Sequence, residues 1–427
     1  MGMDTFKKFG GLGGLGKRLS QSMTGSMGIP VGLGLPIAVD FGIGGLKVIQ
    51  VEAGDPPRLV AATCLDTPDE LLNDHPGRLE FQFKALPKLI RQGGFKGKRA
   101  VCTLPAWQTA CKCLQFQKSE GVPVSELVKA ALPAQLGVSP ESIVYRFIEV
   151  SNPTQTGKAE VIVLAAARDQ VEHLMKGLVN AKLEPVGMQS EFIAVVRAFD
   201  HITKRDGDIN VTTLYLDLGA GSTKVMIAHG RQLVFARLID VGGRHLDELA
   251  AKQLDCGLAE ARAARLSLEL KATPVAVAAG GPTGDEAVAA AEAASGTNSD
   301  RRAGDTAPAK GFGGNLLEQE RVHVAPEPVR LDEPLEILVD EVQVCLRYHA
   351  SQFPGRKIDR AVFVGGESRH RGLCQHIARG LRLPAQTADP LAWIARTGLE
   401  PANGVDMKQP QPGWAVPIGL CLSPTDL

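Results

Sequence analysis

The chain has 427 residues, which is long enough for two or more domains with separate hydrophobic cores. Lysine plus arginine equal aspartate plus glutamate at 47 each, and aromatic residues make up only 5%, so neither net charge nor stacking surfaces favour a nucleic-acid partner. Eight scattered cysteines, with Cys111 and Cys113 lacking metal-site spacing, predict buried thiols in a reducing, cytoplasmic compartment. No apolar run reaches the roughly 18 uninterrupted residues of a membrane span.

The first 35 residues, 1–35, are rich in Gly, Ser and Met, which predicts a flexible tail. Apolar residues at helical spacing beside basic ones leave open a short amphipathic helix that contacts a membrane or a partner. These residues are Phe6, Phe9, Leu12, Leu15 and Leu19, with Lys7, Lys8, Lys17 and Arg18 beside them.

A hairpin with an acidic residue at its tip follows at residues 37–50. An apolar strand leads to Asp40, a glycine-containing turn follows, and a second apolar strand carries Lys47. Glycines at such a tip let backbone N–H groups approach an anion closely, and the acid can hold the water shell of a magnesium ion. The glycines concerned are Gly42, Gly44 and Gly45.

The next part of the chain alternates strands and helices. We expect a strand at 59–64, a helix at 71–92 and a strand at 99–104. From residue 107 to 183 the pattern becomes strand, helix, strand, strand, helix, strand, which is typical of a small inserted α/β subdomain. Its strands are expected at 109–116, 143–150 and 160–166, with a returning strand that begins at 183–186. Its helices are expected at 124–136 and 169–181, and a further helix follows at 191–199.

A second hairpin at residues 214–227 repeats the pattern of the first. Its acid is Asp217, and a lysine, Lys224, again stands seven residues after the acid. We expect Lys224 to be solvated, and Lys47 to be either solvated or a phosphate contact. Two such hairpins, roughly 180 residues apart, predict two similar domains facing each other across a nucleotide cleft. The turn residues of this copy are Gly219, Ala220, Gly221, Ser222 and Thr223.

The pattern of the last part of the chain, from residue 233, predicts another sheet with its helices. A third strand at 233–238 leads through paired glycines into a helix, and residues 271–328, rich in Ala, Gly, Pro and Asp, predict a disordered insertion. A helix at 335–349, a strand at 360–364 and a helix at 373–381 follow. The strand-to-helix turn carries Gly365, Gly366 and Glu367, and short apolar elements close the chain at 384–387 and 417–421.

These segments, in this order, resemble the actin-like ATPase superfamily and, within it, the PilM family of type IV pilus assembly proteins, with the cell-division protein FtsA as a relative. Residues 40–47 and 217–224 are similar to the two phosphate loops, and 363–366 to the adenosine-binding turn. Residues 191–197 and 340–346 resemble the two helices that cross between lobes. Residues 107–183, 237–243 and 383–390 favour the pilus family.

The resemblance implies an α/β, duplicated actin-like (RNase H-like) fold of two lobes with a small inserted subdomain. The implied domain limits are a tail at 1–35, a first lobe at 36–106 and 184–205, the inserted subdomain at 107–183, a second lobe at 206–270 and 329–427, and a disordered insertion at 271–328.

The resemblance also implies that ATP lies between the lobes. Asp40 and Asp217 would orient magnesium through water, and Gly365, Gly366 and Glu367 would border the adenosine. The phosphates would be held by Gly42, Gly44, Gly45 and Lys47 on one side and by Gly219, Ala220, Gly221, Ser222 and Thr223 on the other. The resemblance assigns no catalytic residue and implies at most a slow ATPase.

The first loop departs from the family pattern. Hydroxyl residues usually follow the glycine where this chain has Ile43, Gly44 and Gly45. Each lost hydrogen bond to a charged phosphate costs about 1.5–3 kcal/mol, so we expect weaker nucleotide binding, with the intact second loop favouring retained binding.

The implied function is a cytoplasmic scaffold of a type IV pilus, or a related type II secretion platform, at the inner face of the inner membrane. Its implied partners are the N-terminal peptide of an inner-membrane assembly protein, bound between the first lobe and the inserted subdomain, and the pilus motor ATPases. Peripheral membrane association and self-association stay open.

Two alternatives carry different functions. An FtsA-like division or cytoskeletal protein would contact the membrane, but that relative ends in an amphipathic helix and residues 423–427 form none. An actin-fold small-molecule kinase needs an acidic base besides the two loop acids, and the sequence identifies none.

Overall fold

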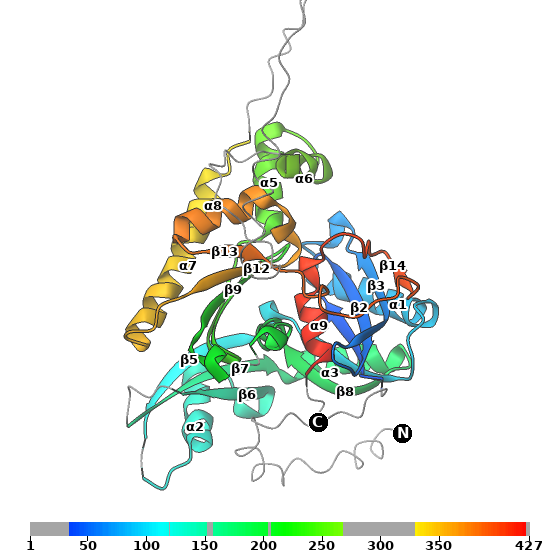
Figure 1. The fold of residues 1–427 in the computed structure, drawn as a ribbon. Coiled ribbons are helices and arrows are strands. Elements are labelled where there is room, and N and C mark those ends of the chain that lie inside the picture. Colours follow the sequence, from blue (N-terminus) through cyan, green and yellow to red (C-terminus); the bar gives the residue numbers. More distant parts are fainter. Residues whose placement is uncertain (1–33, 119, 152–156, 204–205, 268–328, 424–427) are drawn as a thin grey trace, which may run out of the picture.

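The computed structural model describes residues 34–118, 120–151, 157–203, 206–267 and 329–423. The expected tail up to residue 33 and the expected insertion at 271–328 therefore lie outside the described residues. Within the described part, two β-sheets lie on either side of a central pair of helices, and a third, smaller sheet lies below them in Figure 1.

The first lobe is built on a six-stranded sheet in the order β14-β3-β2-β1-β4-β8. The first three strands in the chain pair antiparallel, whereas β4 and β8 add parallel to β1. α1 (His75–Gln92) and α3 (Arg168–Asn180) cover one face through buried Leu86, Leu174 and Leu178. The strands are β1 (Ile37–Phe41), β2 (Gly45–Glu52), β3 (Arg58–Asp66), β4 (Arg99–Leu104), β8 (Glu184–Ser190) and β14 (Ala402–Asn403).

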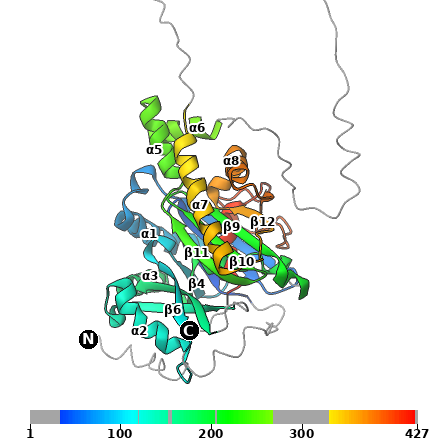
Figure 2. The ribbon, with the colours of Figure 1, turned by 90° about the vertical axis from the view of Figure 1, so that its left-hand side faces the viewer.

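The second lobe repeats this strand order in a five-stranded sheet, β11-β10-β9-β12-β13. Again the first three strands pair antiparallel and the next two add parallel, so the core unit is duplicated. α7 (Asp332–Gln352) runs along this sheet in Figure 2 and packs against α8 (Arg371–Leu381). The strands are β9 (Thr212–Leu218), β10 (Thr223–His229), β11 (Gln232–Ile239), β12 (Arg360–Val364) and β13 (Ala385–Thr387).

The small sheet has the antiparallel order β5-β7-β6, with β5 at Ala110–Gln117, β6 at Ile143–Val150 and β7 at Lys158–Ala167. Alternate residues of β7 serve two cores, as the period of two in a strand requires. Val161 and Val163 pack with α2 (Val124–Leu136), whereas Ile162 and Leu164 join the core that contains the second lobe. The subdomain therefore packs against the second lobe as well as continuing from the first.

Two short, largely apolar helices pack together between the large sheets. They are α4 (Glu191–Arg197) and α9 (Ala415–Cys421), and α9 also contacts β1, β2 and β4. A Cβ on Gly419 would lie only 1.8 Å from the carbonyl oxygen of Ala194, so the helices cross in direct backbone contact. α4 and α9 are therefore the two helices that cross between the lobes.

The assignment of residues 340–346 to the second crossing helix is wrong. That segment belongs to α7, which packs on the second sheet and against α8, and α9 lies opposite α4 instead. The chain also returns to the first lobe before α9, because β14 pairs with β3 and the Ala395 amide donates to the Pro57 carbonyl at 2.8 Å. The C-terminal segment thus contributes to both lobes.

Candidate nucleotide cleft

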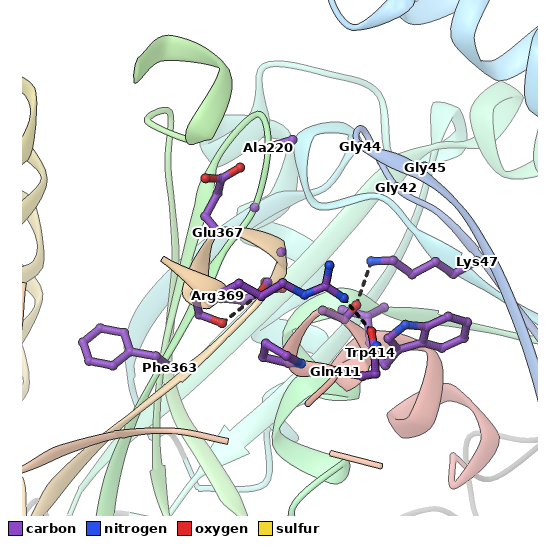
Figure 3. A pocket seen from close by; sticks show the side chains of 18 of the residues that line it. Gly42, Gly44, Gly45, Lys47, Ala220, Phe363, Glu367, Arg369, Gln411 and Trp414 are labelled. Atoms are coloured by element: carbon purple, nitrogen blue, oxygen red, sulfur yellow. Dashed lines mark hydrogen bonds between the residues drawn. The ribbon is translucent and has the colours of Figure 1, made fainter. Parts of the chain in front are cut away.

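The tips of the two repeated hairpins face each other across a cleft of about 1590 Å³ between the lobes. A Cβ on Gly44 would lie 3.4 Å from the Cβ of Ala220, and a Cβ on Gly221 would lie 2.4 Å from Cδ1 of Ile43. The loops therefore approach each other directly, as Figure 3 shows for Gly44 and Ala220. The side chain of Ile43 packs over the second loop.

Hydrogen bonds from neighbouring elements fix each loop. In the first, the side-chain amide of Gln82 on α1 donates to the Gly42 carbonyl at 2.8 Å, and the Thr67 amide donates to the Gly44 carbonyl at 3.1 Å. In the second, the Gly219 amide donates to the Ser222 carbonyl at 3.0 Å. Because these carbonyls are bonded within the protein, the loops hold one shape and can leave amides for an anion.

The start of α5 (Gly243–Leu254) supports the second loop from behind. Its first amides point at the loop: Gly243 donates to the Gly219 carbonyl at 3.0 Å and Arg244 to the Ala220 carbonyl at 2.7 Å. The paired glycines expected before this helix thus have a structural use, because a Cβ on Gly242 would lie 2.4 Å from the Ser222 nitrogen.

The floor of the cleft is acidic and buried. Asp40 is the last but one residue of β1 and Asp217 of β9, and each is 5% exposed. Lys224 is the cross-strand partner of Asp217, and its ammonium lies 2.8 Å from Asp217 Oδ2 and also pairs with Glu191 at the start of α4. The expectation that Lys224 is solvated is therefore wrong, because the side chain points into the cleft floor.

The pKa values of Asp40 and Lys224 in the floor are both raised, for different reasons. Burial raises the pKa of the Asp40 carboxyl to about 7, although the nearby Lys47 ammonium acts against this change. The Thr103 hydroxyl donates to Asp40 Oδ1 at 3.3 Å. Burial alone would lower the pKa of Lys224, but the charges of Asp217 and Glu191 outweigh burial and raise it above its usual value. Lys224 is therefore charged at neutral pH.

Lys47 occupies the corresponding position on the first hairpin, as the cross-strand partner of Asp40. Its ammonium does not pair with the acid but donates to the Gly413 carbonyl at 2.7 Å, as Figure 3 shows. Gly413 precedes α9, so this bond joins the first hairpin to the segment between the lobes. The side chain lines the cleft, and a phosphate contact by Lys47 stays a prediction.

The expected adenosine side is formed by the turn after β12. Gly365 has a φ of 92°, and a Cβ there would lie 2.3 Å from the Leu218 carbonyl and 2.4 Å from Asp217 Oδ1, so only glycine fits. Gly366 faces open space within the cleft. Glu367 is ion-paired to the buried Arg265 at 2.9 Å, so its carboxylate is already bonded within the protein.

Thirteen of the fourteen expected site residues line this one cleft, and the exception is Thr223. Thr223 is 1% exposed, and its hydroxyl donates to the Val241 carbonyl at 2.8 Å, so it supports the sheet instead of facing the cleft. The thirteen are Asp40, Gly42, Gly44, Gly45, Lys47, Asp217, Gly219, Ala220, Gly221, Ser222, Gly365, Gly366 and Glu367.

Sequence reasoning missed several charged residues of the cleft. Glu191 begins a short apolar helix and carries no motif, and its signal is only an acid in the first turn of a buried helix. Arg262 on α6 (Leu258–Ser267) lies in a segment expected only to be helical, yet it pairs at 2.9 Å with Asp69 of the first lobe. Only tertiary contact brings these residues to the cleft.

A magnesium ion held directly by these acids does not fit the arrangement. Asp217 already accepts from Lys224, and the described residues contain no cluster of three or more His, Cys, Asp or Glu side chains suited to a metal. An ion held through water by Asp40 and Asp217 stays a prediction. No helix in the described part of the chain is long and apolar enough to span a membrane.

Two lobes of the same strand order, two crossing helices and a cleft between two Asp-Gly hairpins define the actin-like ATPase fold. Residues 127–273 match a family model described as type IV pilus assembly protein PilM. A PilM-PilN type IV pilus biogenesis complex is similar in structure, with a TM-score of 0.64, 19% identity and coverage of 91% of this chain and 97% of that chain. The expected resemblance to PilM is therefore confirmed.

More distant solved structures are similar as well. The ethanolamine utilization protein EutJ from Carboxydothermus hydrogenoformans has a TM-score of 0.45 and 14% identity, with 92% of this chain and 90% of that chain covered. MreB 5 of Spiroplasma citri bound to AMPPNP has a TM-score of 0.46 and 13% identity, with 91% and 95% covered. Comparison with the curated proteins finds no match.

Proposed function

We propose that the chain is a nucleotide-binding scaffold of a type IV pilus, or related type II secretion, assembly platform at the cytoplasmic face of the inner membrane. The observation that carries the proposal is the facing pair of Asp-Gly hairpins in a PilM-like fold. The scaffold role rests on the resemblance.

An adenine nucleotide is the proposed ligand of the cleft. The two hairpin loops would hold its phosphates, because their glycines leave backbone amides accessible and Ser222 adds a hydroxyl. Gly366, which faces open space, would border the adenosine. Hydrolysis would be slow at most, as the resemblance implies.

A kinase role gains no support from the third acid of the cleft. Glu191 could be the acidic base that such an enzyme needs, but one of its carboxylate oxygens pairs with Lys224 and the other accepts from the Ala106 amide at 3.1 Å. A carboxylate bonded on both oxygens inside the protein is poorly placed to take a proton from a substrate.

The proposed partner is a short N-terminal peptide of an inner-membrane assembly protein. The solved PilM-PilN complex supports this partner class. The proposed site lies where the first lobe meets the inserted subdomain, near the stacked rings of His75 and Trp107, whose centroids are 4.3 Å apart. Pilus motor ATPases are proposed as further partners.

The partner proposal is tested with the full chain and a fluorescent peptide copied from the cytoplasmic N-terminus of the inner-membrane protein of the same system. We expect saturable binding in the micromolar range by fluorescence anisotropy, about −8 kcal/mol. A scrambled peptide of the same composition is the control. Equal binding of both peptides, or of neither, would contradict the proposed partner.

A further inference from the structure

We propose that Lys224 is an internal cation that does the work of a divalent metal in the cleft, so that phosphates bind there without a metal ion. The proposal concerns the same cleft as the proposed nucleotide function. Its statement about phosphate binding rests on that proposed function. The metal part stands on the contacts of Lys224 alone and can be tested without nucleotide.

The position of Lys224 follows from strand register. Lys224 and Asp217 are cross-strand partners on β10 and β9, so their side chains leave the same face of the sheet. The ammonium lies 2.8 Å from Asp217 Oδ2 and pairs with Glu191 from the crossing helix α4. All three side chains are buried, with side-chain exposures of 11%, 7% and 8% for Lys224, Asp217 and Glu191. One ammonium therefore bridges two buried carboxylates.

One oxygen of Asp217 is paired inside the protein. Oδ2 accepts from Lys224, and the turn at Gly365 lies against the side of Oδ1, where an added Cβ would come within 2.4 Å of that oxygen. A metal ion would need one of these oxygens, or a water bonded to one of them. Asp217, which the hairpin pattern indicates as the magnesium residue, thus already has an ammonium at Oδ2 and the Gly365 turn beside Oδ1.

The opposite side of the floor does not suit a hydrated ion either. Magnesium keeps several waters, and these waters need polar partners. Ile43 packs its Cδ1 over Gly221 at the point where the two loops meet, and a Cβ on Gly44 would lie 3.4 Å from the Cβ of Ala220. An apolar contact therefore stands where the two loops meet, and it offers no polar partner to the waters of such an ion.

A buried lysine that bridges two acids can also be purely structural, so the test needs a readout that a structural role would not move. That readout is rescue by a divalent cation. If the ammonium takes the place of a metal, Lys224→Ala should leave Asp217 and Glu191 as two uncompensated buried carboxylates that one metal ion can bridge.

The experiment measures thermal unfolding and manganese binding, by electron paramagnetic resonance, on the full chain without nucleotide. We expect the unsubstituted protein to bind no Mn²⁺ at the cleft and to keep its Tm when Mg²⁺ is added. We expect Lys224→Ala to lower the Tm by several degrees and to regain part of it with one bound Mn²⁺. Lys84→Ala, which removes an exposed lysine paired with Glu80 on α1, is the matched control and should gain no ion.

One outcome overturns the proposal directly: an unsubstituted protein that binds one Mn²⁺ ion and loses it on Asp217→Asn. If Lys224→Ala fails to fold, affinity for ADP decides, measured with Mg²⁺ and again in EDTA. We expect the two affinities to agree within about twofold, whereas a loss of tenfold or more in EDTA, about 1.4 kcal/mol, overturns the proposal. If no nucleotide binds at all, the proposed nucleotide function fails, and the manganese result on the unsubstituted protein and Asp217→Asn still decides the question of the metal.

Discussion

Arg262 Nη2 lies 2.9 Å from Asp69 Oδ1, and this ion pair joins the two lobes across the mouth of the cleft. The same side of the cleft carries two more bonds between lobes, from Arg244 to the Leu72 carbonyl at 3.3 Å and from Asn73 to Glu248 at 3.1 Å. The crossing helices hold the lobes at the other end. The mouth therefore closes by polar contacts that can open without breaking either core.

Arg262→Ala should loosen the mouth. The side chains of Arg262 and Asp69 are about one-third exposed, so their pair is expected to contribute no more than about 1 kcal/mol to the free energy of unfolding. Arg262 also pairs at 2.9 Å with the buried Asp247, which keeps Arg265 as a second partner at 2.6 Å, so a further loss of stability is expected. We expect faster hydrogen exchange at residues 69–73, measured by mass spectrometry. Arg237→Ala breaks an ion pair of similar exposure within the second lobe and is the control. Unchanged exchange at 69–73 would show that the pair does not hold the mouth closed.

Lys224→Ala should be strongly destabilising in the absence of a divalent cation. It leaves Asp217 and Glu191 as buried carboxylates of like charge, and removing one partner of a buried ion pair costs about 3–5 kcal/mol. Urea denaturation gives the free energy of unfolding. Adding Asp217→Asn to Lys224→Ala should recover part of the loss, because one buried charge is then removed. A loss below about 1 kcal/mol for the single variant would contradict the bridging role.

A buried histidine pair should make the protein sensitive to acid. His229 and His349 contact through their Nε2 atoms at 2.9 Å, and burial lowers the pKa of each to about 4 from 6.5. Between these values the unfolded chain binds more protons than the folded protein. The free energy of unfolding should therefore fall as the pH drops from 6.5 to 4, by up to about 1.4 kcal/mol per pH unit for each histidine.

This pH dependence is measured by urea denaturation at several pH values. His349→Gln should flatten the fall, because an amide does not titrate. His173→Gln, at an exposed position of α3, is the control and should leave the slope unchanged. A slope that is the same in all three proteins would rule out the pair as its source.

Ile43→Ser should strengthen nucleotide binding. The serine would add a hydroxyl to the first loop and relieve the contact of Ile43 with Gly221. One hydrogen bond to a charged phosphate contributes about 1.5–3 kcal/mol, which is roughly tenfold or more in affinity. Calorimetric titration with ATP measures the gain. Equal or weaker binding would mean that Ile43 does not limit access to the phosphate position.

Much of the fold could be predicted because the sequence patterns that specify it lie within short segments. An apolar run, an acid, a glycine turn and a second apolar run specify each hairpin within fourteen residues, and the structure forms both as β1–β2 and β9–β10. The glycine turn after β12 is equally local. Thirteen of the fourteen residues expected from these segments line the cleft, and their roles toward a nucleotide stay predictions.

The failures depend on contacts between distant segments. Lys224 reads as a solvated strand residue until Glu191, 33 positions earlier, is brought against it by α4. The second crossing helix was assigned within α7 because that helix has a long apolar stripe, whereas α9 has only seven residues and no polar face. Thr223 follows the loop in sequence, but strand alternation turns its hydroxyl toward Val241. Sequence pattern alone contains none of these three facts.

The central claim is that an adenine nucleotide binds between the two hairpin loops and the turn at Gly365 and Gly366. Calorimetric titration of ATP into the full chain tests this claim most directly. Two variants are titrated beside it. Gly366→Leu would place a side chain in the open cleft, and the control Gly257→Leu adds a side chain in open space outside the cleft. The account predicts one site per chain that Gly257→Leu keeps and Gly366→Leu loses. No heat of binding in the unsubstituted protein, or equal affinity in all three, would contradict it.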